Sequence, residues 1–351
     1  MTIQEPSIKR IQSIDALRAI AAFAVIVIHT TPFRTQFASN GYSLDLALFL
    51  NQLARFAVPF FFVISGYFWA TKFDRQELVC SPTVEMLKRI LWVFFAWSFI
   101  YLLPWNIYDA LAQGWGGPAK IFYNNLSIAI ENPLTTATQG TKGHLWFLVG
   151  LACSLSISAL LIRFGLTWLL VALALSLYLI GLAGKAYADS PIGFHVKFNF
   201  RDGPFFSLIF FVTGYLIQRS GPSGFWFPVA ALATVGGMIL HFIELFLAQR
   251  NWGTIMAQDY VIGTYFFGTG AALMALSNHR FLASSRAKSV GHLALGIYAA
   301  QFIFIDMLAP LERKFSNNII WAAAHPILVF ILSCAVAALL SKKPSTRRLV
   351  A

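Results

Sequence analysis

Long apolar runs separated by short polar segments dominate the chain. A helix needs about 20 mostly apolar residues to cross a bilayer, and proline, glycine or charged residues interrupt the sequence between runs of about that length. The pattern predicts about ten membrane-spanning helices, at residues 14–31, 44–70, 86–104, 143–162, 166–184, 205–219, 225–248, 258–277, 291–309 and 319–340. Segment 118–132 places its apolar residues on one helical face. It fits either a helix lying at the membrane surface or a packed loop helix.

Composition agrees with a membrane protein. The 351 residues are 58% hydrophobic and 11% charged, with mean hydropathy +0.68, whereas soluble domains carry about 25% charged residues. No stretch is polar enough to form a soluble domain, and no internal repeat is evident. We therefore expect an all-α, polytopic membrane helix bundle in which residues 1–351 form a single integral membrane domain. The first run is expected to be retained rather than cleaved as a signal peptide, because it is long and contains Arg18 and His29.

The charge balance predicts the orientation. The chain has 26 Lys and Arg against 14 Asp and Glu, a net charge of +12. With ten spans, the segments on the side of both termini hold more Lys and Arg than those on the other side, including the tail at 342–348, so both termini are expected to be cytoplasmic. The excess also suits contact with anionic lipids. No metal-ligand spacing is present, and basic residues do not alternate with aromatic ones on a soluble face, so neither a metal nor nucleic acid is expected.

Three ionisable residues lie in the first run. Arg18 and His29 are 11 positions apart, which places them about 20° apart around a helix and about 16.5 Å along it, with Asp15 on nearly the same face. Charges in hydrocarbon are costly, so a polar stripe of this kind indicates a cavity inside the bundle. A second interpretation stays open: Arg18 reaches the inner interface, Asp15 pairs with it or serves as a helix-start charge, and His29 caps the outer end.

Four sequence blocks, in order, carry a resemblance to a known family. They are Asp-Ala-Leu-Arg at 15–18 followed after ten residues by His29, Val-Pro-Phe-Phe-Phe-Val-Ile-Ser-Gly-Tyr at 58–67, His-Leu-Trp-Phe-Leu at 144–148, and Leu-Gly-Ile-Tyr at 295–298. Together they resemble the acyltransferase-3 family of integral membrane O-acyltransferases, and most closely its branch that includes the enterobacterial-common-antigen O-acetyltransferase. The blocks span most of the chain.

The resemblance implies an acyl-CoA-dependent O-acyltransferase of the bacterial inner membrane. Its donor would be acetyl-CoA or another acyl-CoA, and its acceptor a hydroxyl of a cell-envelope or exported saccharide, including a lipid-linked one. His29 would act as general base or take the acyl group itself. Arg18 would attract the donor's phosphates or polarise the thioester, with Asp15 holding it in place. Assembly into a homo-oligomer stays open.

The resemblance also implies that basic residues near the second and third helices hold the donor's phosphates together with Arg18. The candidates are Lys72, Lys88 and Arg89, because phosphates need Arg or Lys partners. A simpler interpretation is that these three residues are positive anchors on the cytoplasmic side.

Five residues are candidates for the acceptor side, and four of them have a structural alternative. Arg55 either reaches the membrane interface or contacts the acceptor, and Ser65 either packs between helices or lies near the acyl path. His144 and Trp146 would form a platform for a sugar ring or belong to an interfacial aromatic belt. Many family members have His near Gln301, and glutamine cannot titrate near neutral pH.

A function of another class also fits ten helices. The polar stripe could line the path of a non-enzymatic carrier or exporter of lipid-linked saccharide. Such transporters more often contain inverted repeats with paired broken helices, and the sequence shows none. Binding of acyl-CoA would distinguish the enzyme from the carrier.

Overall fold

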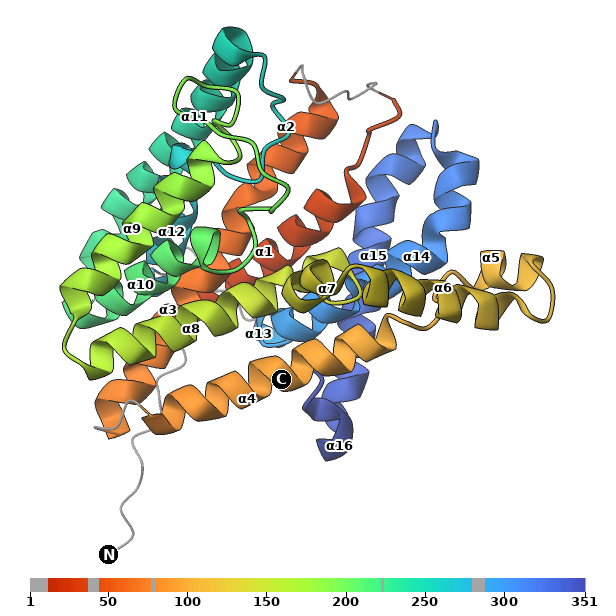
Figure 1. The fold of residues 1–351 in the computed structure, drawn as a ribbon, viewed down its shortest axis with the longest axis horizontal. Helices are drawn as coiled ribbons and strands as arrows, with labels where there is room; N and C mark the ends of the chain where they lie inside the picture. The colour runs from red at the N-terminus through yellow and green to blue at the C-terminus, as the bar shows by residue number, and fades with distance from the viewer. Residues whose placement is uncertain (1–11, 37–43, 77–79, 222–223, 280–287, 351) are drawn as a thin grey trace, which may run out of the picture.

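The computed structural model describes residues 12–36, 44–76, 80–221, 224–279 and 288–350, and within these ranges the chain is all-helical (Figure 1). The longer helices are α1 (Gln12–Thr30), α3 (Ala57–Gln76), α4 (Cys80–Ile100), α6 (Gly117–Glu131), α8 (Trp146–Arg163), α9 (Thr167–Ala183), α10 (Pro204–Ser220), α11 (Phe227–Trp252), α12 (Ile262–Leu276), α14 (Ala294–Phe315) and α15 (Ile319–Lys342). The short ones are α2 (Leu46–Leu53), η1 (Ala54–Phe56), α5 (Ile107–Ala112), α7 (Pro133–Gln139), η2 (Gly143–Leu145), η3 (Gly224–Trp226), α13 (Lys288–Gly291) and α16 (Pro344–Arg347). The predicted fold class is confirmed.

Every predicted span falls on a helical region whose ends differ from the prediction by a few residues. In the described part of the chain, six helical segments are long and apolar enough to cross a membrane, namely Gln12–Thr30, Leu46–Lys72, Gly143–Arg163, Phe227–Trp252, Ala294–Phe315 and Ile319–Lys342. Thr167–Ala183 and Ile262–Leu276 are apolar but shorter. The chain is therefore a polytopic helical membrane protein, while the count of ten spans stays a prediction.

Helix α1 lies inside the bundle. It contacts α3, α12, α14 and α15, while α3 packs on α10, and α8 packs on both α4 and α10. The pairs α11–α12 and α14–α15 form the other main contacts, and α5, α6 and α7 project to one side (Figure 1). The end of α3, the start of α4 and α16 share one end of the molecule, and the start of α2 and the end of α11 lie at the other (Figure 1). The polar stripe on α1 is thus enclosed by neighbouring helices.

Glycine makes the contact between α3 and α10 possible. A Cβ at Gly66 would overlap the backbone carbonyl of Phe211, and a Cβ at Gly214 would overlap that of Val63. Small residues let two helices approach closely, and packing of this kind drives helix association in lipid. The reciprocal pair holds α3, which carries part of the cavity wall described below, firmly against α10.

We predict that Gly214→Ala destabilises the protein by about 1–3 kcal/mol, because the added methyl group must push the two backbones apart. Gly236→Ala is the matched control, since nothing lies within 4 Å of a Cβ at that exposed position on α11. There the change should be neutral or stabilise by up to about 1 kcal/mol, as alanine favours helix more than glycine does. Thermal unfolding in detergent measures both, and equal effects would contradict the packing account.

Candidate active site

A cavity of about 570 Å³ lies along α1 and is walled by α3, α4, α8, α14 and the residues just before α14. Seven candidate residues line it: Arg18, His29, Ser65, Lys72, Arg89, His144 and Trp146. Much of the remaining wall is apolar or aromatic, including Phe61, Phe68 and Tyr298. The cavity brings candidates for the donor side and for the acceptor side around one space.

The inner part of the α1 stripe is an ion pair beside the cavity. Arg18 Nη1 lies 3.9 Å from Asp15 Oδ1, and the Arg18 guanidinium lies 5.1 Å from the centre of the Phe68 ring. The Asp15 residue is 4% exposed and does not line the cavity. Its backbone packs against Gly291, where a Cβ would overlap it. Asp15 is therefore placed to orient Arg18 rather than to touch a substrate.

At the other end of the stripe, His29 stands among aromatic rings. Its ring centre is 4.8 Å from that of Phe302 in an edge-to-face arrangement and 6.2 Å from that of His144. Phe302 also stacks on His144, with ring centres 4.5 Å apart. Two imidazoles from helices distant in sequence thus share one aromatic partner at the wall of the cavity. A neutral imidazole carries one nitrogen that accepts a proton and one that donates.

His144 is buried in an aromatic box. The residue is 2% exposed, and its ring is 5.2 Å from the rings of Tyr101 and Tyr298. The Tyr298 hydroxyl donates to the His144 backbone carbonyl. Among the described residues, neither buried ring nitrogen of His144 has a hydrogen-bond partner. Buried polar groups are normally paired, so this ring has an unmet capacity for hydrogen bonds at the wall of the cavity.

Trp146 lines the same cavity but offers little open surface. The residue is 6% exposed, and its ring lies against those of Phe62 and Phe206. The guanidinium of Arg201 covers it at 4.7 Å from the ring centre. The ring therefore has limited room to stack on a sugar, and it also serves as a support for Arg201.

Besides Asp15, three more candidates lie outside the cavity wall. Lys88 is exposed on α4, whereas its neighbour Arg89 lines the cavity. Gln301 is 0% exposed, and its Nε2 donates to the Tyr298 carbonyl at 3.0 Å. The Gln301 Oε1 is buried without a partner among the described residues. Arg55 belongs to a separate group of charges.

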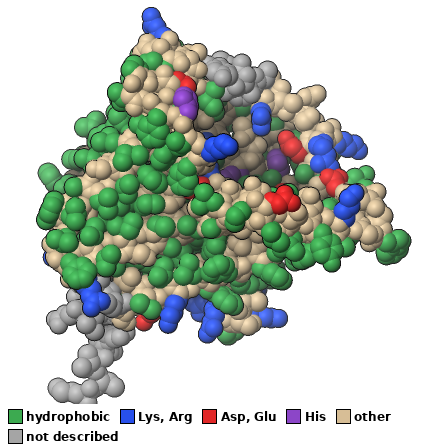
Figure 2. Space-filling model, in the orientation of Figure 1, with side chains coloured by type: hydrophobic (Ala, Val, Ile, Leu, Met, Phe, Trp, Pro, Cys, Tyr) green, Lys and Arg blue, Asp and Glu red, His purple; other side chains and the backbone are tan. Residues whose placement is uncertain are grey.

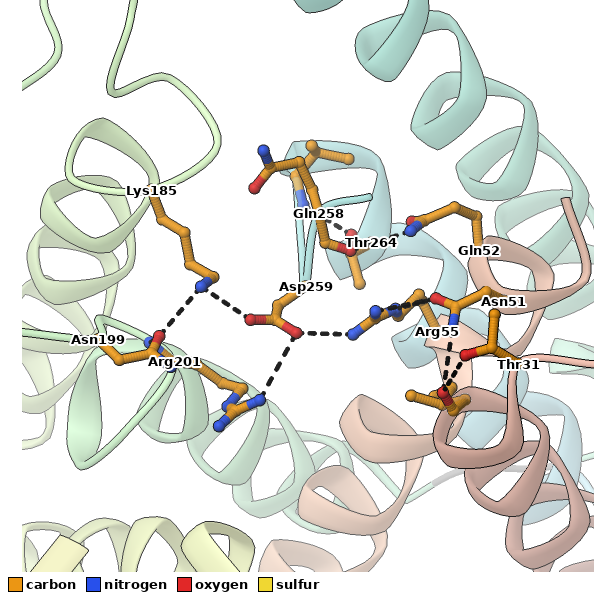
Figure 3. Close-up of polar contacts among 12 residues, drawn as sticks. Thr31, Asn51, Gln52, Arg55, Lys185, Asn199, Arg201, Gln258, Asp259 and Thr264 are labelled. Atoms are coloured by element: carbon orange, nitrogen blue, oxygen red, sulfur yellow. Dashed lines mark hydrogen bonds and ion pairs between the residues drawn. The ribbon is translucent and has the colours of Figure 1, made fainter. Parts of the chain in front are cut away.

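That group is centred on Asp259, in the connection between α11 and α12 (Figure 3). Arg55 Nη1 lies 2.7 Å from one carboxylate oxygen of Asp259, Lys185 Nζ lies 2.8 Å from the other, and Arg201 Nη1 is 3.7 Å away. Arg55 Nη2 also donates to the side-chain oxygen Oδ1 of Asn51 at 2.9 Å. We call Arg55, Lys185, Arg201 and Asp259 the Asp259 cluster. It ties together three segments far apart in sequence, since Lys185 and Arg201 both lie in the connection between α9 and α10.

Electrostatics keep the Asp259 carboxyl group charged. Burial acts to raise the pKa of Asp259, but the positive charges of Arg55, Arg201 and Lys185 outweigh it and hold that pKa below its ordinary value. Three cations face this carboxylate, and Asp202 lies 3.5 Å from Arg201 Nε, so positive charges still outnumber the acidic groups around the cluster. It can therefore attract an anionic or strongly polar group.

The Asp259 cluster adjoins the cavity wall through Arg201 and Trp146. A second cation has a similar position, since Lys142 Nζ pairs with Asp306 and lies 5.2 Å from the centre of the Phe302 ring. Figure 2 shows a hollow on this face, with Lys, Arg, acidic and His side chains around it. Sequence reasoning missed Lys142, Lys185, Arg201 and Asp259, because no spacing signal links them and the fold alone brings them together.

Comparisons with known proteins show the family of the chain. A family model described as an acyltransferase domain, of the acyltransferase-3 type, matches residues 11–342. The chain is 30% identical over 227 residues to a serine/alanine racemase of Enterococcus gallinarum, covering 59% of this chain and 29% of that protein. It is 28% identical over 228 residues to an amino-acid racemase of Enterococcus faecalis, covering 59% and 28%. The chain spans less than a third of the length of these curated relatives, and no solved structure matches it.

Proposed function

Because the chain belongs to the acyltransferase-3 family, we propose that this membrane acyltransferase transfers an acyl group from acyl-CoA to a hydroxyl of a cell-envelope or exported saccharide. The likeness of its motifs to the common-antigen branch supports acetyl as the acyl group. The observation that carries the proposal is that Arg18 and His29 line a single cavity together with Lys72 and Arg89. That arrangement suits a donor with a phosphate-bearing end and a reactive thioester end.

The donor would enter at the end of the cavity that carries Lys72 and Arg89. Arg18 follows along α1, where its guanidinium supplies charge-assisted hydrogen bonds to phosphate or polarises the thioester carbonyl. The thioester would then lie within reach of His29. The apolar walls around Phe61 and Phe68 exclude water, which strengthens these electrostatic interactions and limits hydrolysis of the donor.

His29 would provide the acid–base chemistry. One ring nitrogen takes the proton of the acceptor hydroxyl as its oxygen attacks the thioester carbonyl carbon. The tetrahedral intermediate collapses by breaking the carbon–sulfur bond, and the imidazolium returns the proton to the departing thiolate. An ester and the thiol of CoA result, and His29 ends neutral. The free ring nitrogens of His144 suit a second hydrogen bond to the acceptor.

The Asp259 cluster and Lys142 support binding of the acceptor at this end of the cavity. Arg201 lies over Trp146, which lines the cavity, and Lys142 lies over Phe302, whose ring contacts both His29 and His144. A saccharide offers many hydroxyl acceptors and often a phosphate or carboxylate, which suits Arg and Lys donors. Mass spectrometry of envelope saccharides from cells with and without the protein tests the proposal. Loss of an ester in the deletion supports it, and identical ester patterns oppose it.

The proposal includes an orientation in the cytoplasmic membrane with the tail inside the cell. In a variant without native cysteines, Ser345→Cys near α16 should be protected from a membrane-impermeant thiol reagent in intact cells. His195→Cys should react, because it is exposed in the connection between α9 and α10, at the opposite end of the molecule. Permeabilised cells give the control in which both positions react. If only Ser345→Cys is labelled in intact cells, the orientation is the opposite of the one proposed.

A further inference from the structure

A second pocket lies beside the tail, at the end of the molecule that holds α16 (Figure 1). It is open to the surface, has a volume of about 580 Å³ and is lined by Arg89, Ser341, Lys342, Pro344, Arg347 and Arg348, most of which are exposed. Lys and Arg side chains also gather along this edge of the surface (Figure 2). Arg89 lines both this pocket and the cavity that contains His29. The two spaces therefore adjoin at Arg89.

The tail that forms this pocket is anchored in the fold. Val350 is 1% exposed and packs where Gly296 of α14 leaves room for it. The Trp97 indole of α4 donates to the Leu349 carbonyl at 2.8 Å, and the Thr346 hydroxyl donates to the Leu340 carbonyl at 2.7 Å. Charges that served only to orient the chain in the membrane would need no such fixed position. These contacts hold Arg347 and Arg348 beside Arg89.

The cations of this pocket lack acidic partners. Arg89, Lys342, Arg347 and Arg348 form no ion pair with any described carboxylate. Four like charges around one space repel one another, so the arrangement favours a ligand that carries several negative charges. Phosphates meet this requirement, and arginine's planar fork matches their geometry.

We infer that the tail pocket binds the phosphates at the nucleotide end of acyl-CoA, with Arg89 at the point where the pantetheine arm passes into the cavity. The inference rests on the proposed function and extends it, because it assigns donor binding to Lys342, Arg347 and Arg348. Acyl-CoA carries a diphosphate and a separate 3′-phosphate, which suits four cations better than the single phosphate of a common lipid headgroup. The tail thus binds the nucleotide of the donor, while Arg18 and His29 act on its thioester.

Binding of acetyl-CoA and of acetyl-3′-dephospho-CoA to purified protein in neutral-lipid nanodiscs tests the inference. Wild type should bind acetyl-CoA at least about tenfold more tightly than acetyl-3′-dephospho-CoA, since the 3′-phosphate gains charge-assisted partners. The Arg347→Gln/Arg348→Gln variant should weaken acetyl-CoA binding by about tenfold or more and lose most of the preference. Lys343→Gln is the matched control, because this tail cation does not line the pocket, and its binding should stay close to wild type.

The outcomes separate the two proposals. Acetyl-CoA binding that is equal in wild type and in the double variant overturns the tail assignment and leaves the proposed function standing. No binding of acetyl-CoA by wild type overturns both. A third outcome assigns the pocket to a lipid headgroup and also overturns the inference. In that case phosphatidylglycerol nanodiscs stabilise wild type but not the double variant, and the double variant binds acetyl-CoA normally. Thermal unfolding of each variant confirms that the protein is folded.

Discussion

Replacing His29 with alanine should lower acyl transfer by about 10²–10⁴-fold, the usual contribution of a general acid–base group, while acetyl-CoA binding stays near that of wild type. The reason is geometric. His29 lines the cavity among Phe302 and His144, about three helical turns from Arg18, so removing its ring leaves the charged end of the donor site intact. Donor binding and transfer are measured separately on the same purified sample.

His195→Ala provides the matched control, because that imidazole is largely exposed and lies away from the cavity. It should transfer at the wild-type rate. An acyl group carried on His29 would be seen as labelled protein after rapid quenching of wild type with radiolabelled donor, and it would be absent from His29→Ala. Wild-type transfer in His29→Ala would contradict the assignment of His29 as a catalytic residue.

Replacing Asp259 with asparagine should lower the free energy of unfolding by up to about 3 kcal/mol, the lower end of the usual cost of removing one partner of a buried ion pair, because the Asp259 side chain is still 18% exposed. The change keeps the shape of the side chain but leaves the cations of Arg55, Lys185 and Arg201 without their shared carboxylate. Asp306→Asn is the control, since its more exposed carboxylate pairs with Lys142. Thermal unfolding in detergent near pH 7 compares them, and similar losses in both variants would contradict a special role for the cluster.

The effect of Asp259→Asn on the free energy of unfolding should also depend on pH. The folded-state pKa of Asp259 lies below its ordinary value because three positive charges outweigh the effect of burial. Its contribution to stability is therefore complete above the ordinary aspartate pKa, about 4, and is lost as the pH falls through the lower folded-state pKa. The stability difference between wild type and Asp259→Asn should be constant from pH 7 to about 5 and shrink below about 4.

The helices and the stripe on α1 could be predicted because both depend on local periodicity. Arg18 and His29 share a face through helix geometry alone, whatever surrounds them, and prolines or glycines limit the apolar runs. Lys88 and Arg89 show where this reasoning ends. They are adjacent in sequence and about 100° apart around α4, and only the packing of α4 on α8 decides that Arg89 lines the cavity.

Groups built from distant segments could not be predicted from spacing. Asp259 meets Arg55, Lys185 and Arg201 only after three segments far apart in sequence have been placed in three dimensions. The tail is a second case. Its basic residues predicted the orientation of the chain in the membrane. The burial of Val350 against Gly296 brings Arg347 to the pocket of Arg89, and no local pattern in the sequence predicts that contact.

The central claim is that the chain moves an acyl group from acyl-CoA to an envelope saccharide through the cavity on α1. The most direct measurement uses inside-out membrane vesicles, which expose the cytoplasmic face, from cells that express wild type, His29→Ala or no protein. Acetyl-CoA labelled in its acetyl group is added, and label is counted in the saccharide fraction before and after mild alkali, which cleaves esters. We predict alkali-labile label with wild type alone, and equal label in all three preparations would contradict the claim.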